Sequence, residues 1–157
     1  MMKLAADSRI WVYAAERKLR PAEVQLAQQT ASAFVQQWGS HGRPLDAEAI
    51  VLHNRFLVLA VDQRSAGASG CSIDSSVHFV QRLGAELGVD FFNRMVFHYR
   101  DADGEVHSLH RMDFAQAYRE GKITNTSTVF DPLVETVDAL NSDFEKPLSE
   151  SWHAQMV

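Results

Sequence analysis

One segment of the 157-residue sequence concentrates residue types that can do chemistry: Gly67-Ala68-Ser69-Gly70-Cys71-Ser72-Ile73-Asp74-Ser75-Ser76. Its small residues, hydroxyls and thiol stand at a predicted helix start, where free backbone N–H groups and the positive end of the helix dipole point outward. Such a place can hold an anion or lower the pKa of a thiol, although the charge of Asp74 opposes both effects. The segment Gly67–Asp74 is therefore the candidate site for a small anionic ligand. Its candidate binding residues are Gly70, Cys71, Ser72, Asp74 and Ser75, joined by Arg43.

Cys71, the only cysteine, admits three interpretations. In the one we favour, the glycines shape a turn, Ser72 caps the helix with Ser75 three residues on, and Cys71 is a small buried hydrophobic residue. In the second, the segment forms an anion or small-molecule pocket. In the third, Cys71 is a catalytic nucleophile and His41 is its base. A non-catalytic or ligand-binding protein is thus our leading prediction, and a cysteine-dependent enzyme is the alternative.

Other candidate motifs do not predict a metal or a cofactor. His98, His107 and His110 could supply imidazoles, but a three-residue step in a strand places His107 and His110 on opposite faces. Gly121-Lys122-Ile123-Thr124 lacks the upstream glycine and the adjacent Ser or Thr of a phosphate-binding loop. We therefore expect no metal site, no cofactor and no ATP hydrolysis.

Hydrophobic periodicity and turn residues predict the elements that must position these side chains. An amphipathic helix begins at Pro21, and a second one runs from the Cys71 segment to about Gly88. A last helix is predicted to begin with Asp131 as cap and Pro132 as first residue, burying Leu133, Val137 and Leu140. The predicted strands are Arg9–Ala14, Ala49–His53, Phe56–Val61, Met95–Tyr99 and Val106–Leu109, and a short helix is expected around Phe114–Tyr118.

The first six elements follow the order β-α-β-β-α-β, which is typical of a ferredoxin-like fold with two helices on one face of an antiparallel sheet. We predict one α+β domain over residues 1–157, with an extra C-terminal strand and helices. The alternative is a mixed sheet with helices on both faces, because Phe56–Val61 is apolar throughout. This topology places the loop Gly39–Pro44 at the same end as Cys71. An uncovered edge strand, Ala49–His53, would also suit a self-associating module, in the form of a homodimer.

Composition limits the classes of partner. The net charge is −5, and the lysines and arginines are scattered, which argues against nucleic-acid binding. No apolar run approaches the ~20 residues of a membrane span, and no signal peptide is evident. We therefore expect a cytoplasmic protein that binds no nucleic acid and no membrane.

Several short stretches distributed over the whole chain resemble a family of uncharacterised bacterial proteins of Bacteroidetes type, often labelled ABC transporter ATPase. The stretches are Arg9-Ile10-Trp11-Val12-Tyr13, Trp38 with His41-Gly42, Asn54-Arg55-Phe56, Ala60-Val61-Asp62, Ala68 to Asp74, Val129-Phe130-Asp131 and Ser151-Trp152-His153. The resemblance implies a small soluble bacterial protein and supplies no activity, substrate or cofactor. The ATPase label lacks support, because Leu57–Asp62 imitates a Walker B strand while the phosphate loop is missing.

Overall fold

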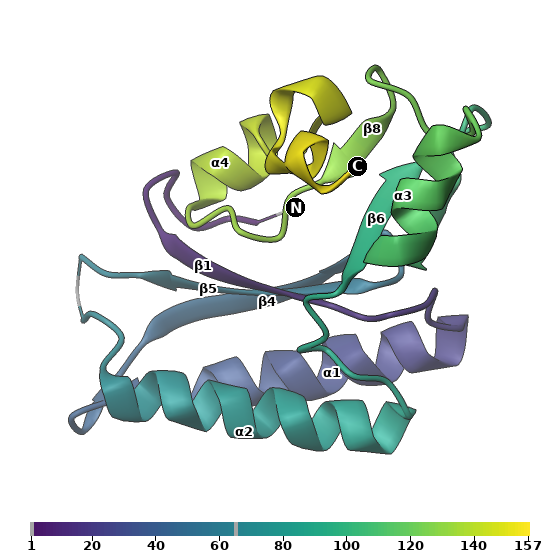
Figure 1. Cartoon of the computed structure of the whole chain (residues 1–157). Helices are drawn as coiled ribbons and strands as arrows, with labels where there is room; N and C mark the ends of the chain where they lie inside the picture. Colours follow the sequence, from purple (N-terminus) through teal and green to yellow (C-terminus); the bar gives the residue numbers. More distant parts are fainter. Residues whose placement is uncertain (1, 65) are drawn as a thin grey trace.

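The computed structural model describes residues 2–64 and 66–157 and has an α+β fold with antiparallel sheets (Figure 1). Strands and longer helices alternate along the first two thirds of the chain, and shorter elements follow. In chain order they are β1 (Arg9–Ala14), α1 (Pro21–Gln37), β2 (Gly39–Ser40), β3 (Arg43–Pro44), β4 (Asp46–Leu52), β5 (Phe56–Asp62), α2 (Gly70–Leu87), β6 (Val96–Arg100), β7 (Val106–His110), α3 (Arg111–Arg119), β8 (Thr128–Phe130), α4 (Val137–Ser142), β9 (Glu145–Pro147) and the 3-10 helices η1 (Leu148–Glu150) and η2 (Trp152–Met156).

The first sheet has the order β1-β5-β4, and its central strand β5 is buried along its whole length. Figure 1 shows why: α1 and α2 cover one face, while α4, β8 and the C-terminal segment cover the other. Leu57, Leu59 and Val61 face the two long helices, and Phe56 and Val58 face the C-terminal layer. A strand between two apolar layers needs no polar alternation, so its uniform hydrophobicity has a direct cause. Coverage of both faces agrees with one part of the predicted alternative, but the sheet is antiparallel and not mixed.

The strand order does not confirm the ferredoxin-like topology. The fourth strand, β6, belongs to a second sheet with the order β7-β6-β8-β9. Part of the outer edge of β1 is instead taken by a later segment, since the Ile10 N–H donates to the Glu135 carbonyl at 3.0 Å and Arg9 forms a bridge with Thr136. The second sheet has its own core around Phe97, Phe114 and Leu148. β6 packs into this second core and pairs with β7 and β8, so it does not extend the first sheet.

The last helix differs from the prediction. Helix α4 is capped by Thr136, whose Oγ1 accepts from the Ala139 N–H at 3.1 Å. Asp131 caps no helix, because a turn follows it and α4 begins only at Val137. Its carboxylate accepts from the Lys146 ammonium, the Trp152 indole and the Leu133 N–H, each at 2.9 Å. Val137 and Leu140 are buried as expected, but Leu133 is 58% exposed. The carboxylate therefore joins the C-terminal segment to β9 and leaves Leu133 at the surface.

The β4–β5 hairpin lies where the sequence predicts it, but its turn begins at His53, which was predicted as the last residue of the strand Ala49–His53. In the β4–β5 hairpin, His53 and Asn54 both have positive φ, 52° and 58°, as a tight hairpin turn requires. Helix α1 begins at Pro21, and the β6–β7 hairpin and α3 lie where the sequence predicts them.

Candidate functional site

At the start of α2, one of the predicted binding residues, Ser72, takes part in capping the helix. The N-cap is Ser69 and not Ser72: the Ser69 Oγ accepts from the Ser72 N–H at 3.2 Å, and the Ser72 Oγ accepts from the Ser69 N–H at 2.6 Å. Ser72 is buried in this capping box. Gly70, Asp74 and Ser75 remain exposed at the surface.

Cys71 is exposed, so the expectation that it is a buried hydrophobic residue is wrong. It occupies the second residue of α2, where its side chain is not directed into the core between α2 and the sheet. Its position relative to the β2–β3 turn agrees with the predicted topology, because the Trp38 indole N–H donates to the Ser72 carbonyl at 2.7 Å. His41 and Arg43 are exposed in that neighbouring turn. Among the described residues, however, no hydrogen bond joins Cys71 to His41.

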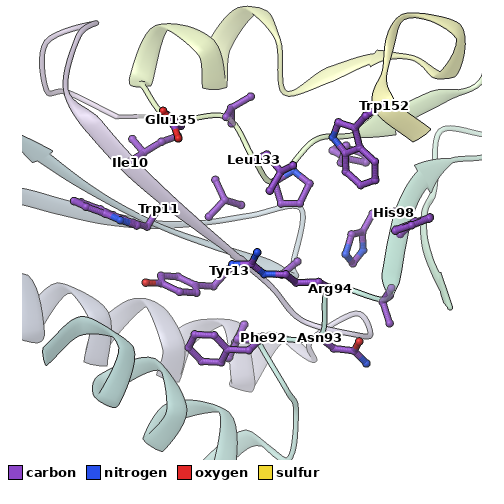
Figure 2. Close-up of a pocket in the computed structure, with 18 of the residues that line it drawn as sticks. Ile10, Trp11, Tyr13, Phe92, Asn93, Arg94, His98, Leu133, Glu135 and Trp152 are labelled. Atoms are coloured by element: carbon purple, nitrogen blue, oxygen red, sulfur yellow. The ribbon is translucent and has the colours of Figure 1, made fainter. Parts of the chain in front are cut away.

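A cavity of about 490 Å³ lies elsewhere, between β1 and the C-terminal layer (Figure 2). Its volume falls in the range of small-molecule sites, which are mostly apolar with a few placed polar groups. Its walls come from segments that are far apart in the sequence. They are Arg9–Ala14 of β1, Ile73 and Val77 of α2, Phe91–Arg94 of the following loop, Val96–His98 of β6, Phe130, Pro132–Glu135 and Trp152–His153.

Aromatic and apolar side chains form most of the wall. Tyr13 and Phe92 meet edge to face with ring centroids 5.4 Å apart. Trp152 stacks on His153 at 3.8 Å. Phe92 and Leu133 remain partly exposed at the opening. Exposed apolar groups beside a cavity are a common property of ligand sites.

The charged groups of the pocket leave one arginine without a partner. Arg9 lies 3.9 Å from Glu135, and its guanidinium lies over the Trp11 ring at 5.1 Å. Arg94 makes no ion pair or hydrogen bond with any residue that the structure describes. Figure 2 shows its side chain within the pocket, between Tyr13 and His98. The pocket therefore has an excess of positive charge.

His98 presents a neutral imidazole to the pocket. Its Nδ1 lies 2.8 Å from the Ser108 Oγ, and that oxygen already accepts from the Arg55 guanidinium. When the remaining proton of the Ser108 hydroxyl is donated to Nδ1, the ring proton of His98 lies on Nε2. Burial, with the nearby charges of Arg55 and His153, lowers the pKa of His98 to about 3. Figure 2 shows the ring pointing toward the pocket, where its N–H can donate.

His153 repeats this arrangement in the neighbouring wall. The Ser151 Oγ lies 2.6 Å from its Nδ1, and its Nε2 has no hydrogen-bond partner among the described residues. Burial lowers the pKa of His153 to about 4, and the charge of Asp131 opposes this shift. Both imidazoles are thus neutral near pH 7 and act as hydrogen-bonding groups instead of cations.

The other histidines considered as metal ligands serve separate local roles. The His107 Nε2 lies 2.6 Å from the Asp101 carboxylate, and the His110 Nδ1 accepts from the Met112 N–H at 3.2 Å. In the described part of the chain, no group of three or more His, Cys, Asp or Glu residues could hold a metal ion.

The edge predicted for self-association is partly covered. The Gln28 side chain of α1 donates to the Ala49 carbonyl and accepts from the Val51 N–H, both at 3.0 Å. This amide occupies two of the outward backbone groups of β4, as a neighbouring strand would.

Sequence reasoning did not identify the pocket, because its residues come from several segments that are distant in the sequence. The available signal was aromatic: Trp11, Tyr13 and Trp152 stand in stretches that also carry the family resemblance. Nothing in their spacing indicates that they meet.

Comparison of the chain with protein-family models, with curated proteins and with solved structures finds no match. The resemblance to uncharacterised bacterial proteins therefore stays a prediction. None of the described helices has the length and apolar character needed to cross a lipid bilayer.

Proposed function

We propose that the protein is a non-catalytic binding protein for a small amphipathic organic anion, held in the pocket beside β1. The proposal keeps the small anionic ligand predicted from the sequence and moves its site away from Gly67–Asp74. The observation that carries it is Arg94, an exposed residue that lines a largely apolar pocket of about 490 Å³ and has no partner among the described residues. An apolar ligand body would gain from the aromatic walls, and an anionic group would gain from the guanidinium.

The residues of the pocket support binding more than catalysis. A general base works best when its pKa lies near the operating pH, whereas burial holds the pKa of His98 near 3 and that of His153 near 4. The lining residues that the structure describes include no cysteine, serine, threonine or lysine that could act as nucleophile. The cysteine-dependent enzyme remains the alternative proposal, and its support is the exposure of Cys71.

A matched pair of fluorescent probes tests the proposal. 1-Anilinonaphthalene-8-sulfonate is an aromatic anion, and N-phenyl-1-naphthylamine has the same rings without the sulfonate. We expect the anion to bind at one saturable site, and Arg94→Gln to weaken that binding roughly 3- to 10-fold, the range expected for one partly exposed charge pair. The neutral probe should bind wild type and Arg94→Gln equally. Arg82→Gln, at an exposed position of α2 outside the pocket, should change neither affinity.

The sulfonate probe also binds loosely packed states, so near-UV circular dichroism must show that each variant keeps its tertiary structure. If the sulfonate probe shows no saturable site, or if Arg94→Gln and Arg82→Gln behave alike, the pocket is not the anion site that we propose.

A further inference from the structure

The pocket lies against an open edge of the first sheet. In an antiparallel pair, the backbone groups of alternate residues point toward the partner strand and away from it. The Ile10 N–H donates to Glu135, on the side away from β5, so Val12 and Ala14, two and four residues on, also direct their N–H and C=O groups outward. These four groups of Val12 and Ala14 have no hydrogen-bond partner in the part of the chain that the structure describes.

The open stretch is short and bounded. At its start, Glu135 and Thr136 take the outward side of Arg9 and Ile10. At its other end, β1 finishes at Ala14, and the Ala15 N–H turns back to the Arg55 carbonyl at 2.8 Å. Both Val12 and Ala14 line the pocket. The backbone groups left open there match one or two amide groups of an extended ligand.

We infer that the ligand is an N-acyl amino acid, a small molecule with an apolar acyl group, one secondary amide and a terminal carboxylate. Its amino-acid residue lies beside β1 as one residue of an added strand: the amide N–H donates to the Val12 carbonyl, and one carboxylate oxygen accepts from the Val12 N–H. Its carboxylate pairs with Arg94, and its apolar groups contact the aromatic walls. The inference rests on the proposed function and adds the amide to the required chemistry.

The size of the site favours a small molecule over a segment of another protein. A cavity of about 490 Å³ encloses a ligand of this kind, whereas a protein segment would continue beyond Ala14, where β1 ends. At the start of β1, Glu135 and Thr136 already occupy the edge beside Ile10 and Arg9. An added strand therefore has no room to extend past one or two residues.

The amide is tested with N-benzoyl-L-phenylalanine and its ester isostere O-benzoyl-L-phenyllactate, which lacks only the N–H donor. Isothermal titration calorimetry should give about tenfold tighter binding of the amide, because the ester leaves the Val12 carbonyl without its donor. Equal affinities would overturn the inference. In that case the proposed function still stands if the sulfonate probe binds, and it fails with the inference if no anionic probe binds.

Val12→Pro tests the protein side, because proline removes an N–H that points away from β5 and is tolerated at sheet edges. Both N-benzoyl-L-phenylalanine and its ester isostere should bind this variant about tenfold more weakly than they bind wild type. The matched control is Ala49→Pro, which removes an outward N–H that has no hydrogen-bond partner among the described residues, from the opposite edge of the same sheet, and should leave both affinities unchanged. If Val12→Pro does not fold, hydrogen exchange of the wild-type protein tests the same contact. The Val12 N–H should exchange more slowly when N-benzoyl-L-phenylalanine is bound. Absence of protection, or tighter binding of an octapeptide ending in phenylalanine, would contradict the assignment to an N-acyl amino acid.

Discussion

Replacing His98 by phenylalanine should remove a defined part of the acid sensitivity of the fold. Burial beside Arg55 and His153 lowers the pKa of His98 to about 3, whereas a histidine in the unfolded chain titrates near 6.5. Between these values the unfolded state binds one proton more than the native state, so stability falls as the pH falls. The stabilisation is complete above pH ~6.5 and decreases below it by about 1.4 kcal/mol per pH unit.

For His98 alone, the loss between pH 7 and pH 5 is about 2 kcal/mol, because about 1.5 of those pH units lie below the unfolded pKa. His153, whose pKa is lowered to about 4 by burial against the raising effect of Asp131, adds a loss of similar size and the same sign. Together they remove about 4 kcal/mol, a large share of the 5–15 kcal/mol that is typical of a domain. Aspartate and glutamate titrate mostly below this window, near pH 4.

Urea unfolding followed by fluorescence of the three tryptophans measures this effect at pH 7, 6 and 5. His98→Phe should be about 1 kcal/mol less stable at pH 7, since it loses the hydrogen bond to Ser108, and its stability should depend less on pH by about 1.4 kcal/mol per unit. His78→Phe, the same substitution at an exposed position of α2, should keep the wild-type slope. Equal slopes for wild type and His98→Phe would show that the buried imidazole is protonated as readily as in the unfolded chain.

Other predictions test separate parts of the structure. Because Cys71 is exposed and has no hydrogen bond to His41 among the described residues, a thiol reagent should label it without unfolding, and His41→Ala should not change the rate; a histidine-dependent rate would instead support the cysteine enzyme. Gly84→Ala should cost about 1–3 kcal/mol in urea unfolding, because the new Cβ would lie 2.6 Å from the Val89 carbonyl oxygen; a cost no larger than that of Ala85→Gly would contradict this. Gln28→Ala uncovers the outward groups of Ala49 and Val51, so light scattering should detect more self-association than in wild type, and a monomer at all concentrations would argue against dimerisation through β4.

The sequence was sufficient for the local elements, because their signals are local. Proline at the start of α1, glycine at the end of α2 and Asn54 in a tight turn each act within a few residues. The uniform hydrophobicity of Phe56–Val61 also correctly indicated a strand buried on both faces. The helix predicted at Asp131 failed because a distant lysine and tryptophan compete for that carboxylate.

Local signals could not predict which sheet β6 joins, and they could not predict where the pocket lies. Whether β6 pairs with β1 or with β8 depends on which apolar surfaces the C-terminal third offers, and periodicity within β6 is the same in both cases. The candidate site at the start of α2 was chosen from residue types, yet its hydroxyls are used for capping. Arg94 carries no signal in the sequence, since its importance comes only from the absence of a partner at its position in space.

The pocket and the departure from the ferredoxin-like order have the same structural origin. A fourth strand beside β1 would have filled the space next to Val12 and Ala14 and paired their backbone groups, but β6 pairs with β7 and β8 instead. The result is a cavity in which apolar walls lie beside backbone groups that have no partner among residues 2–64 and 66–157. Water can satisfy those groups, but it gains little from the apolar walls. A ligand that provides both an amide and apolar surface binds only the native state, so it must raise the free energy of unfolding by mass action. Binding of the proposed ligand at β1 would therefore give Val12 the strand-like pairing that the described residues do not supply.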